Sequence, residues 1–118
     1  MNDSKEMARL AYDAMDDKLA KDITIIDISR VSVVADYFLI ADGKNRNQVQ
    51  AIANNVDEFL GKAGYHAKAT EGYSTANWIL MDYSDVIIHI FSTEDRAFYD
   101  LERIWKDGVE IKREDLDK

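Results

Sequence analysis

The first stretch of the chain carries apolar residues on one face of a helix. Apolar side chains occupy positions 7, 10, 11, 14, 15 and 19. Recurrence at i, i+3 and i+4 predicts an amphipathic helix that ends near Lys21. Asp3 followed by Glu6 resembles a capping box, so we expect the helix to begin there.

The same spacing returns in residues 49–63, which predicts a second amphipathic helix. Asn45 is a suitable N-cap, and Gln48 three residues later completes a capping box. Gly64 stands where a helix usually ends on a residue with a left-handed backbone.

Short runs of β-branched and aromatic residues predict the strands. Residues 23–28 and 37–41 are apolar on both alternating faces, which is typical of strands covered on both sides. Residues 78–83 and 86–91 predict a hairpin, because only two residues lie between these strands. Residues 66–71 predict a weaker strand.

The end of the chain predicts one more helix and a tail. Ser92 and Thr93 are good N-caps for a helix. Residues 107–118 are expected to form a charged C-terminal tail that is frayed from Lys112 to Lys118. The buried stripe of this last helix would contain Phe98, Leu101, Ile104 and Trp105.

The order of these elements predicts the fold class. A helix, two strands, a helix, three strands and a helix fit one α/β layered domain over residues 1–118. We expect a mixed five-stranded sheet flanked by helices. No linker, repeat or low-complexity segment divides the chain.

Composition and charge narrow the classes of function. Apolar residues make up 47% of the 118, which excludes a disordered chain. No apolar run approaches the roughly 20 residues that cross a membrane. The polar, acidic start is no secretory signal, which favours the cytoplasm. The net charge of −8 disfavours direct nucleic-acid binding and favours a basic protein partner, although many acidic proteins are acidic only for solubility.

Candidate chemistry is sparse, so we expect no enzyme, no cofactor and no metal site. The chain has no cysteine, and its histidines are His66 and His89. His89 alternates with apolar residues and is more readily a hydrogen-bonded structural histidine than a general base. Gly43 before a helix lacks the frame of a phosphate loop. Asp82 and Asp85 do not share a strand face, so they make no convincing metal pair.

Surface recognition is the remaining class of function. Aromatic residues ringed by carboxylates near the predicted hairpin are a candidate hot spot for a basic partner, with ordinary core packing of Trp78 as the alternative. Trp78, Leu80 and Asp82 fall on one face of their strand, and Tyr83 falls on the other. The neighbouring candidates are Glu71, Tyr73 and Asp85.

A series of short motifs runs along nearly the whole chain, from Leu10 to about Lys106. In order, they are Asp27-Ile28-Ser29, Ser32, residues 35–41, Gly43, residues 49–53, Glu71-Gly72, residues 78–91, residues 96–102 and Trp105. Together they resemble the ribosomal silencing factor family, also called the RsfS or Iojap-like family. This chain departs from the family at Ser84, where Gly is usual, and at Asp42, where Ser or Thr is usual.

The resemblance implies a fold and a function. The family resembles nucleotidyltransferases in fold but lacks their catalytic carboxylates. Its members bind the large ribosomal subunit through a basic protein of the subunit interface, the fourteenth by the usual count. They sterically block joining of the small subunit and so repress translation. Homodimers occur in the family.

The resemblance also implies the contact residues. Trp78 and Leu80 would supply apolar anchors, and Asp82 and Asp85 would face Arg or Lys of the ribosomal protein. Tyr83 belongs to the same set, with Tyr73 and Glu71 as second-rank candidates. Two alternatives stay open: a large-subunit assembly factor, and a nucleotide-binding or nucleotidyltransferase-like enzyme.

Overall fold

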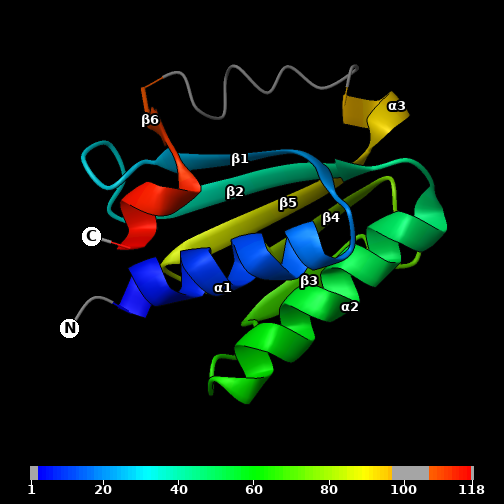
Figure 1. Cartoon of the computed structure of the whole chain (residues 1–118), viewed down its shortest axis with the longest axis horizontal. Coiled ribbons are helices and arrows are strands. Elements are labelled where there is room, and N and C mark those ends of the chain that lie inside the picture. The colour runs from blue at the N-terminus through cyan, green and yellow to red at the C-terminus, as the bar shows by residue number, and fades with distance from the viewer. Residues whose placement is uncertain (1–2, 97–106, 118) are drawn as a thin grey trace.

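The computed structural model describes residues 3–96 and 107–117, and they form helices packed on a sheet (Figure 1). The elements in chain order are α1 (Asp3–Asp17), β1 (Lys21–Asp27), β2 (Tyr37–Gly43), α2 (Arg46–Lys62), β3 (Ala69–Glu71), β4 (Trp78–Asp82), β5 (Val86–Ser92), α3 (Thr93–Arg96), β6 (Val109–Ile111) and the 3-10 helix η1 (Arg113–Asp117).

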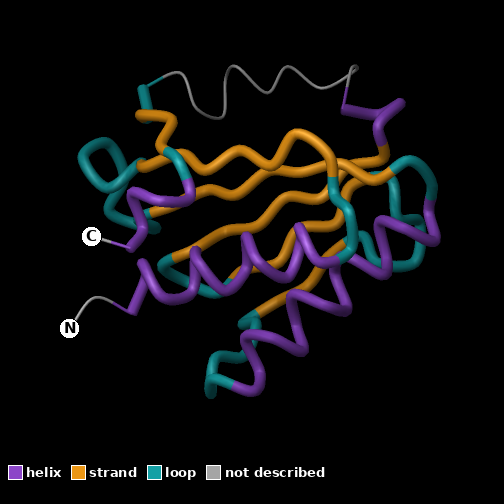
Figure 2. Tube along the Cα trace, viewed as in Figure 1, coloured by secondary structure: helices purple, strands orange, loops and turns teal. Residues whose placement is uncertain are grey.

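The sheet has six strands in the order β3-β4-β5-β2-β1-β6. Only β2 and β5 pair in parallel, and the other neighbours pair antiparallel. The α/β mixed sheet is therefore confirmed, but the prediction of five strands is wrong because it lacked β6. α1 and α2 lie side by side across one face of the sheet (Figures 1 and 2).

The start of α2 follows the predicted cap closely. The Asn45 side chain accepts a hydrogen bond of 2.9 Å from the backbone N–H of Gln48. In turn, the side-chain oxygen of Gln48 accepts a hydrogen bond of 2.7 Å from the backbone N–H of Lys44. Its amide group also donates to the carbonyls of Lys18 and Leu19, which fixes the end of α1 to the start of α2. The helix ends at Lys62, and Gly64 has the expected left-handed backbone, with φ of 91°.

Apolar side chains pack on both faces of the sheet. The larger cluster fills the space under α1 and α2 and includes Leu39, Ile79 and Ile88. β2 is buried along both faces, as its sequence predicted, because it lies at the centre between β5 and β1. The smaller cluster on the opposite face contains Ile26, Ile28, Ala35, Ile40 and Phe91, with Phe38, Trp78 and Ile87 packed against it.

The C-terminal segment is docked, so the prediction of a frayed tail from Lys112 onward is wrong for its described residues. β6 pairs with β1, and Gly108 approaches β1 so closely that a Cβ there would overlap the side chain of Ile26. Leu116 of η1 is buried in the main cluster. Arg113 donates two hydrogen bonds of 3.0 Å to the carboxylate of Asp13 on α1. These long-range contacts were not visible in local sequence.

The last predicted helix begins at Thr93, whose hydroxyl donates a 2.9 Å hydrogen bond to the buried carboxylate of Asp42. Its predicted stripe lies outside the described residues. Within the part of the chain that is described, the helices are too short or too polar to cross a membrane.

Candidate interaction site

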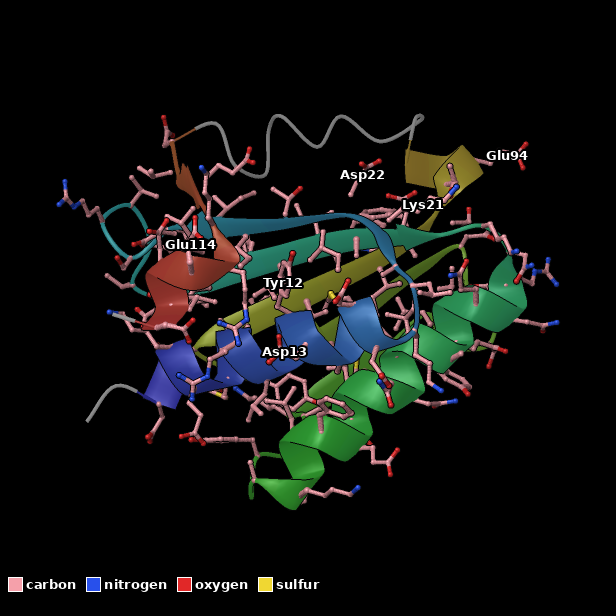
Figure 3. All side chains as sticks on the ribbon, in the orientation of Figure 1. Tyr12, Asp13, Lys21, Asp22, Glu94 and Glu114 are labelled. Atoms are coloured by element: carbon pink, nitrogen blue, oxygen red, sulfur yellow. The ribbon has the colours of Figure 1, made fainter. Side chains whose placement is uncertain are left out.

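The predicted recognition residues gather at the sheet edge formed by β3 and β4. In the antiparallel register, Glu71 lies opposite Leu80, and Ala69 lies opposite Asp82. Glu71, Leu80 and Asp82 therefore share one face of the sheet, the face opposite α1 and α2. Figure 3 draws the side chains of the described residues as sticks on the whole ribbon, in the orientation of Figure 1.

A shallow hollow of about 270 Å³ opens on this face. Glu71 and Gly72 line it from β3 and the following turn, and Trp78 and Leu80 line it from β4. Gly72 has a φ of 80°, and a Cβ at this position would overlap the carbonyl of Trp78. The turn therefore needs glycine both for its backbone conformation and for its close approach to β4.

The Trp78 side chain is half-buried and its orientation is fixed. Its indole N–H donates a 3.0 Å hydrogen bond to Nδ1 of His89 on the neighbouring strand. Its ring stacks on Phe91, with 5.1 Å between the ring centroids. A partner that contacts this ring meets an anchor whose rotamer is already ordered, so binding costs less side-chain entropy.

His89 is buried, and its role is structural. Burial lowers its pKa from 6.5 to about 4, so the ring is neutral near pH 7. Nδ1 accepts from Trp78, which places the proton of the neutral ring on Nε2. The expectation of a histidine hydrogen-bonded to a neighbour is confirmed, although the ring is buried rather than half-buried.

The turn between β4 and β5 presents two carboxylates. Ser84 has a φ of 71°, a region that favours glycine, which accounts for the glycine usual at this position in the family that the motifs resemble. Asp82 stabilises the turn by accepting the Ser84 N–H at 2.8 Å. Asp85 is exposed, and its backbone carbonyl accepts from the N–H groups of Asp36 and Tyr37. The Asp85 side chain therefore faces solvent from a fixed backbone.

The two predicted tyrosines lie on the other side of the sheet. Tyr83 is only 5% exposed and packs in the cluster under the helices. Burial, and then the nearby Asp57 carboxylate, raise its pKa above the usual value of 10. Tyr73 is 39% exposed and lies against α2. The structure thus brings Glu71, Trp78, Leu80, Asp82 and Asp85 to one face and the adjoining turn, but not the tyrosines.

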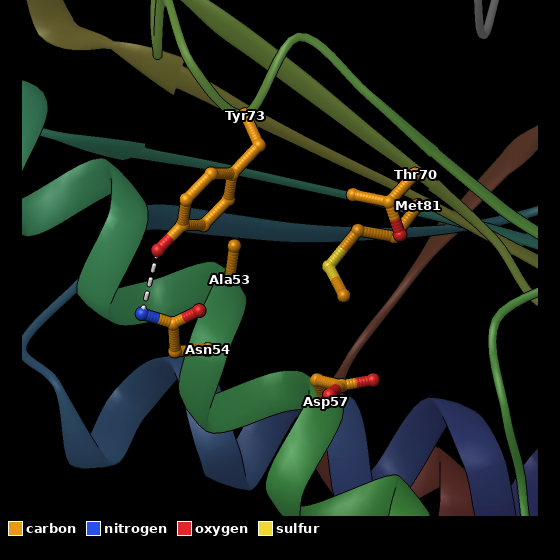
Figure 4. Close-up of a pocket in the computed structure, with 6 residues that line it drawn as sticks. All are labelled: Ala53, Asn54, Asp57, Thr70, Tyr73 and Met81. Atoms are coloured by element: carbon orange, nitrogen blue, oxygen red, sulfur yellow. Dashed lines mark hydrogen bonds between the residues drawn. The ribbon is translucent and has the colours of Figure 1, made fainter.

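Asp57 and Asn54 of α2 were missed as candidates. With Tyr73 they line a second, smaller pocket beside the same sheet edge (Figure 4). The only sequence signal was their place on the polar side of α2, which also fits a solvated helix face. Among residues 3–96 and 107–117, no cluster of three or more His, Cys, Asp or Glu side chains is arranged to hold a metal ion.

Comparisons with known proteins match all or most of the chain. The family model described as "Ribosomal silencing factor during starvation" matches residues 1–118. The ribosomal silencing factor of Halalkalibacterium halodurans is 38% identical over 111 residues, which cover 94% of this chain and 95% of that protein. The ribosomal silencing factor of Bacillus subtilis is 41% identical over 104 residues, which cover 88% of each chain.

A solved structure agrees with this match. The crystal structure of a protein from Chromobacterium violaceum superposes with a TM-score of 0.84 at 33% identity, covering 90% of this chain and 88% of that one. The likeness to nucleotidyltransferases stays a prediction. Sequence, family model and fold agree, and this chain belongs to the ribosomal silencing factor family.

Proposed function

We propose that this protein binds the large ribosomal subunit through a basic subunit-interface protein, the fourteenth by the usual count, and prevents the small subunit from joining. The observation that carries the proposal is the match of all 118 residues to a family of ribosomal silencing factors. No catalysis is required, because a factor that occupies a docking surface shifts the joining equilibrium by mass action. The implied site of action is the cytoplasm.

The proposed contact surface is the β3–β4 edge, defined by Glu71, Trp78, Leu80, Asp82 and Asp85. Trp78 and Leu80 are half-buried and offer apolar area, and the exposed Glu71 carboxylate lies beside them. Apolar anchors bordered by charges are typical of binding hot spots. We leave Tyr83 out of the contact set because its side chain lies in the core.

Electrostatics support a basic partner. The chain carries a net charge of −8, so its field attracts cationic surfaces over several ångströms at physiological ionic strength. Complementary charge speeds encounter and orients the partners. Raising the salt concentration should therefore slow association more than it alters dissociation.

The direct test is sedimentation of purified large and small subunits with and without the protein. We expect the yield of joined ribosomes to fall as the protein is added in excess over the large subunit. An unchanged yield at saturating protein would contradict the proposal. The same gradients, run on immature particles, separate silencing from the alternative role in large-subunit assembly.

A double variant, Trp78→Ala with Asp82→Lys, tests the surface. It should lose large-subunit binding, because it removes the ordered anchor and reverses a charge. Trp78 packs against the smaller core cluster, so circular dichroism must first show that the variant is folded. Asp85→Lys is a milder second variant, since this exposed side chain lies outside the core. Full binding by both folded variants would place the contact surface elsewhere.

Besides the complex with the large subunit, we propose that the protein forms a homodimer, as the resemblance to the family implies. Analytical ultracentrifugation over a range of protein concentrations tests it. A sedimentation coefficient that stays at the monomer value would exclude a dimer under those conditions. The nucleotide-binding alternative also stays a prediction, and calorimetry with ATP and magnesium tests it.

A further inference from the structure

A pocket of about 150 Å³ lies between α2 and the β3–β4 edge, on the helix side of the sheet (Figure 4). It is separate from the hollow beside Glu71, which opens on the opposite side. Asn54, Asp57 and Tyr73 contribute polar groups to it, and Thr70 adds a hydroxyl. Ala53 and Met81 are buried and form its apolar floor.

The loop that carries Tyr73 is held in place from α2. The amide of Asn54 donates a 2.9 Å hydrogen bond to the Tyr73 hydroxyl, as Figure 4 shows. The amide of Gln50 donates a second hydrogen bond, also 2.9 Å, to the Tyr73 carbonyl. Because two contacts hold the loop, the pocket is formed before any partner arrives.

The polar lining of the pocket combines one ionised hydrogen-bond acceptor, the Asp57 carboxylate, with amide and hydroxyl groups. The Asp57 carboxylate lies on the wall, and among the described residues it has no cationic partner. The side-chain oxygens of Thr70 and Asn54 add further acceptors. Close by, the hydroxyl of Tyr83 is buried next to the Asp57 carboxylate. The negative charge of Asp57 raises the pKa of Tyr83 beyond the effect of burial, which places the two groups near each other.

We propose that this pocket receives an arginine side chain of the same ribosomal protein, so that the partner holds the β3 edge from both faces. The proposal rests on the proposed function. A guanidinium group presents several donors in one plane and matches a carboxylate flanked by hydroxyl and amide oxygens. The apolar floor formed by Ala53 and Met81 can pack against the methylene groups of the arginine side chain.

The geometry of β3 makes contact on both sides possible within one short segment. Thr70 lines the pocket and Glu71 lines the hollow, and they are neighbours on the strand. Successive strand residues point to opposite faces. A partner that covers β3 therefore reaches both depressions, one from each side of the edge strand.

The test uses Asp57→Asn and the matched control Glu58→Gln. Both changes remove one negative charge from adjacent positions of α2, but Glu58 is outside the pocket and pairs with Lys62 instead. We expect Asp57→Asn to weaken binding to purified large subunits about tenfold or more, because the arginine loses its ionised acceptor. Glu58→Gln should bind within about twofold of the unmodified protein, as expected for an uninvolved surface charge.

A second measurement examines the pocket without the ribosome. Methylguanidinium should shift the amide NMR signals of Thr70 and Tyr73 saturably in the unmodified protein and in Glu58→Gln, but not in Asp57→Asn. If Asp57→Asn binds large subunits normally while Asp82→Lys does not, the pocket proposal is overturned and the proposed function stands. If the unmodified protein fails to bind large subunits, the proposed function fails, and so does the arginine partner that depends on it.

Discussion

The sheet ends in a three-residue strand at each edge, and the two edges differ in how their charges are arranged. At one edge, β3 carries Glu71 and lies between the hollow lined by Trp78 and Leu80 and the pocket that contains Asp57. At the other edge, the hollow beside β6 contains Arg30 together with Asp27 and Asp107. Unpaired strand edges invite partners unless they are short, charged or covered.

This difference indicates that the β6 edge supports the stability of the fold and that the β3 edge is free to bind a partner. Near β6, Arg113 pairs with Asp13 and Asp117, so one cation of the chain itself offsets two of the carboxylates there. Among the described residues, Glu71 and Asp57 at the β3 edge have no such ion pairs. We therefore expect changes near β6 to affect stability, and changes near β3 to affect binding.

Leu116→Ala should have the largest effect, and the effect should be on stability alone. The side chain is 2% exposed, and replacing a buried leucine by alanine costs about 3 kcal/mol. Urea unfolding measures the loss, while binding to large subunits by the folded variant should stay unchanged. A large loss of binding under folding conditions would show that the β6 edge also contacts the partner.

Glu71→Lys and Glu110→Lys compare the edges directly, because each reverses one exposed glutamate in a three-residue edge strand. We expect Glu71→Lys to weaken large-subunit binding about tenfold to a hundredfold through repulsion from a basic partner. Glu110→Lys should change it by no more than about twofold. If both variants weakened large-subunit binding equally, binding would depend only on the net charge of the chain, and the proposed difference between the two edges would be wrong.

Lowering the pH should loosen the support of the β3–β4 edge through His89. Burial lowers the folded-state pKa of His89 to about 4, against 6.5 when unfolded. Between these values the unfolded chain binds a proton that the folded chain does not, so stability falls as pH falls. The loss from this group is about 2 kcal/mol between pH 7 and pH 5.

Thermal or urea unfolding at both pH values measures this loss. The control is His89→Phe, which should be less stable overall but should lose less stability between pH 7 and pH 5. Identical pH dependence of the two proteins would contradict the assignment, because carboxylates elsewhere would then account for all of it.

Arg113→Met should have the smallest effect. It removes a partly exposed ion pair with two 3.0 Å hydrogen bonds to Asp13, which contributes about 1 kcal/mol. The loss should shrink in high salt because surface charges are then screened. Unfolding of the unmodified protein and the variant in low and high salt measures it, and a loss that does not depend on salt would indicate packing instead.

The sequence predicted the elements whose own pattern is strong. The apolar stripes of α1 and α2, the apolar run on both faces of β2, and the short apolar runs of β4 and β5 identified these elements. The cap at Asn45 was correct since its hydrogen bonds are local. The sequence also indicated which face of the sheet carries Tyr83, because Tyr83 shares the alternating positions of Ile79 and Met81, which face the helices.

The parts that the sequence did not predict depend on contacts between distant segments. β6 contains only Val109–Ile111 among charged residues, and its pairing with β1 has no local signature. The pocket joins Asp57 on a helix to a loop that follows much later, so spacing could not reveal it. The half-buried state of Trp78 depends on Phe91 and His89 of the neighbouring strand.

Photo-crosslinking from the two edges tests the central claim most directly. A photoreactive residue replaces Ala69 on β3 in one variant and Val109 on β6 in the other, since both side chains are exposed. With purified large subunits, position 69 should crosslink to a basic subunit-interface protein, identified by mass spectrometry, and position 109 should not. Crosslinks to that protein from position 109 alone would contradict the account.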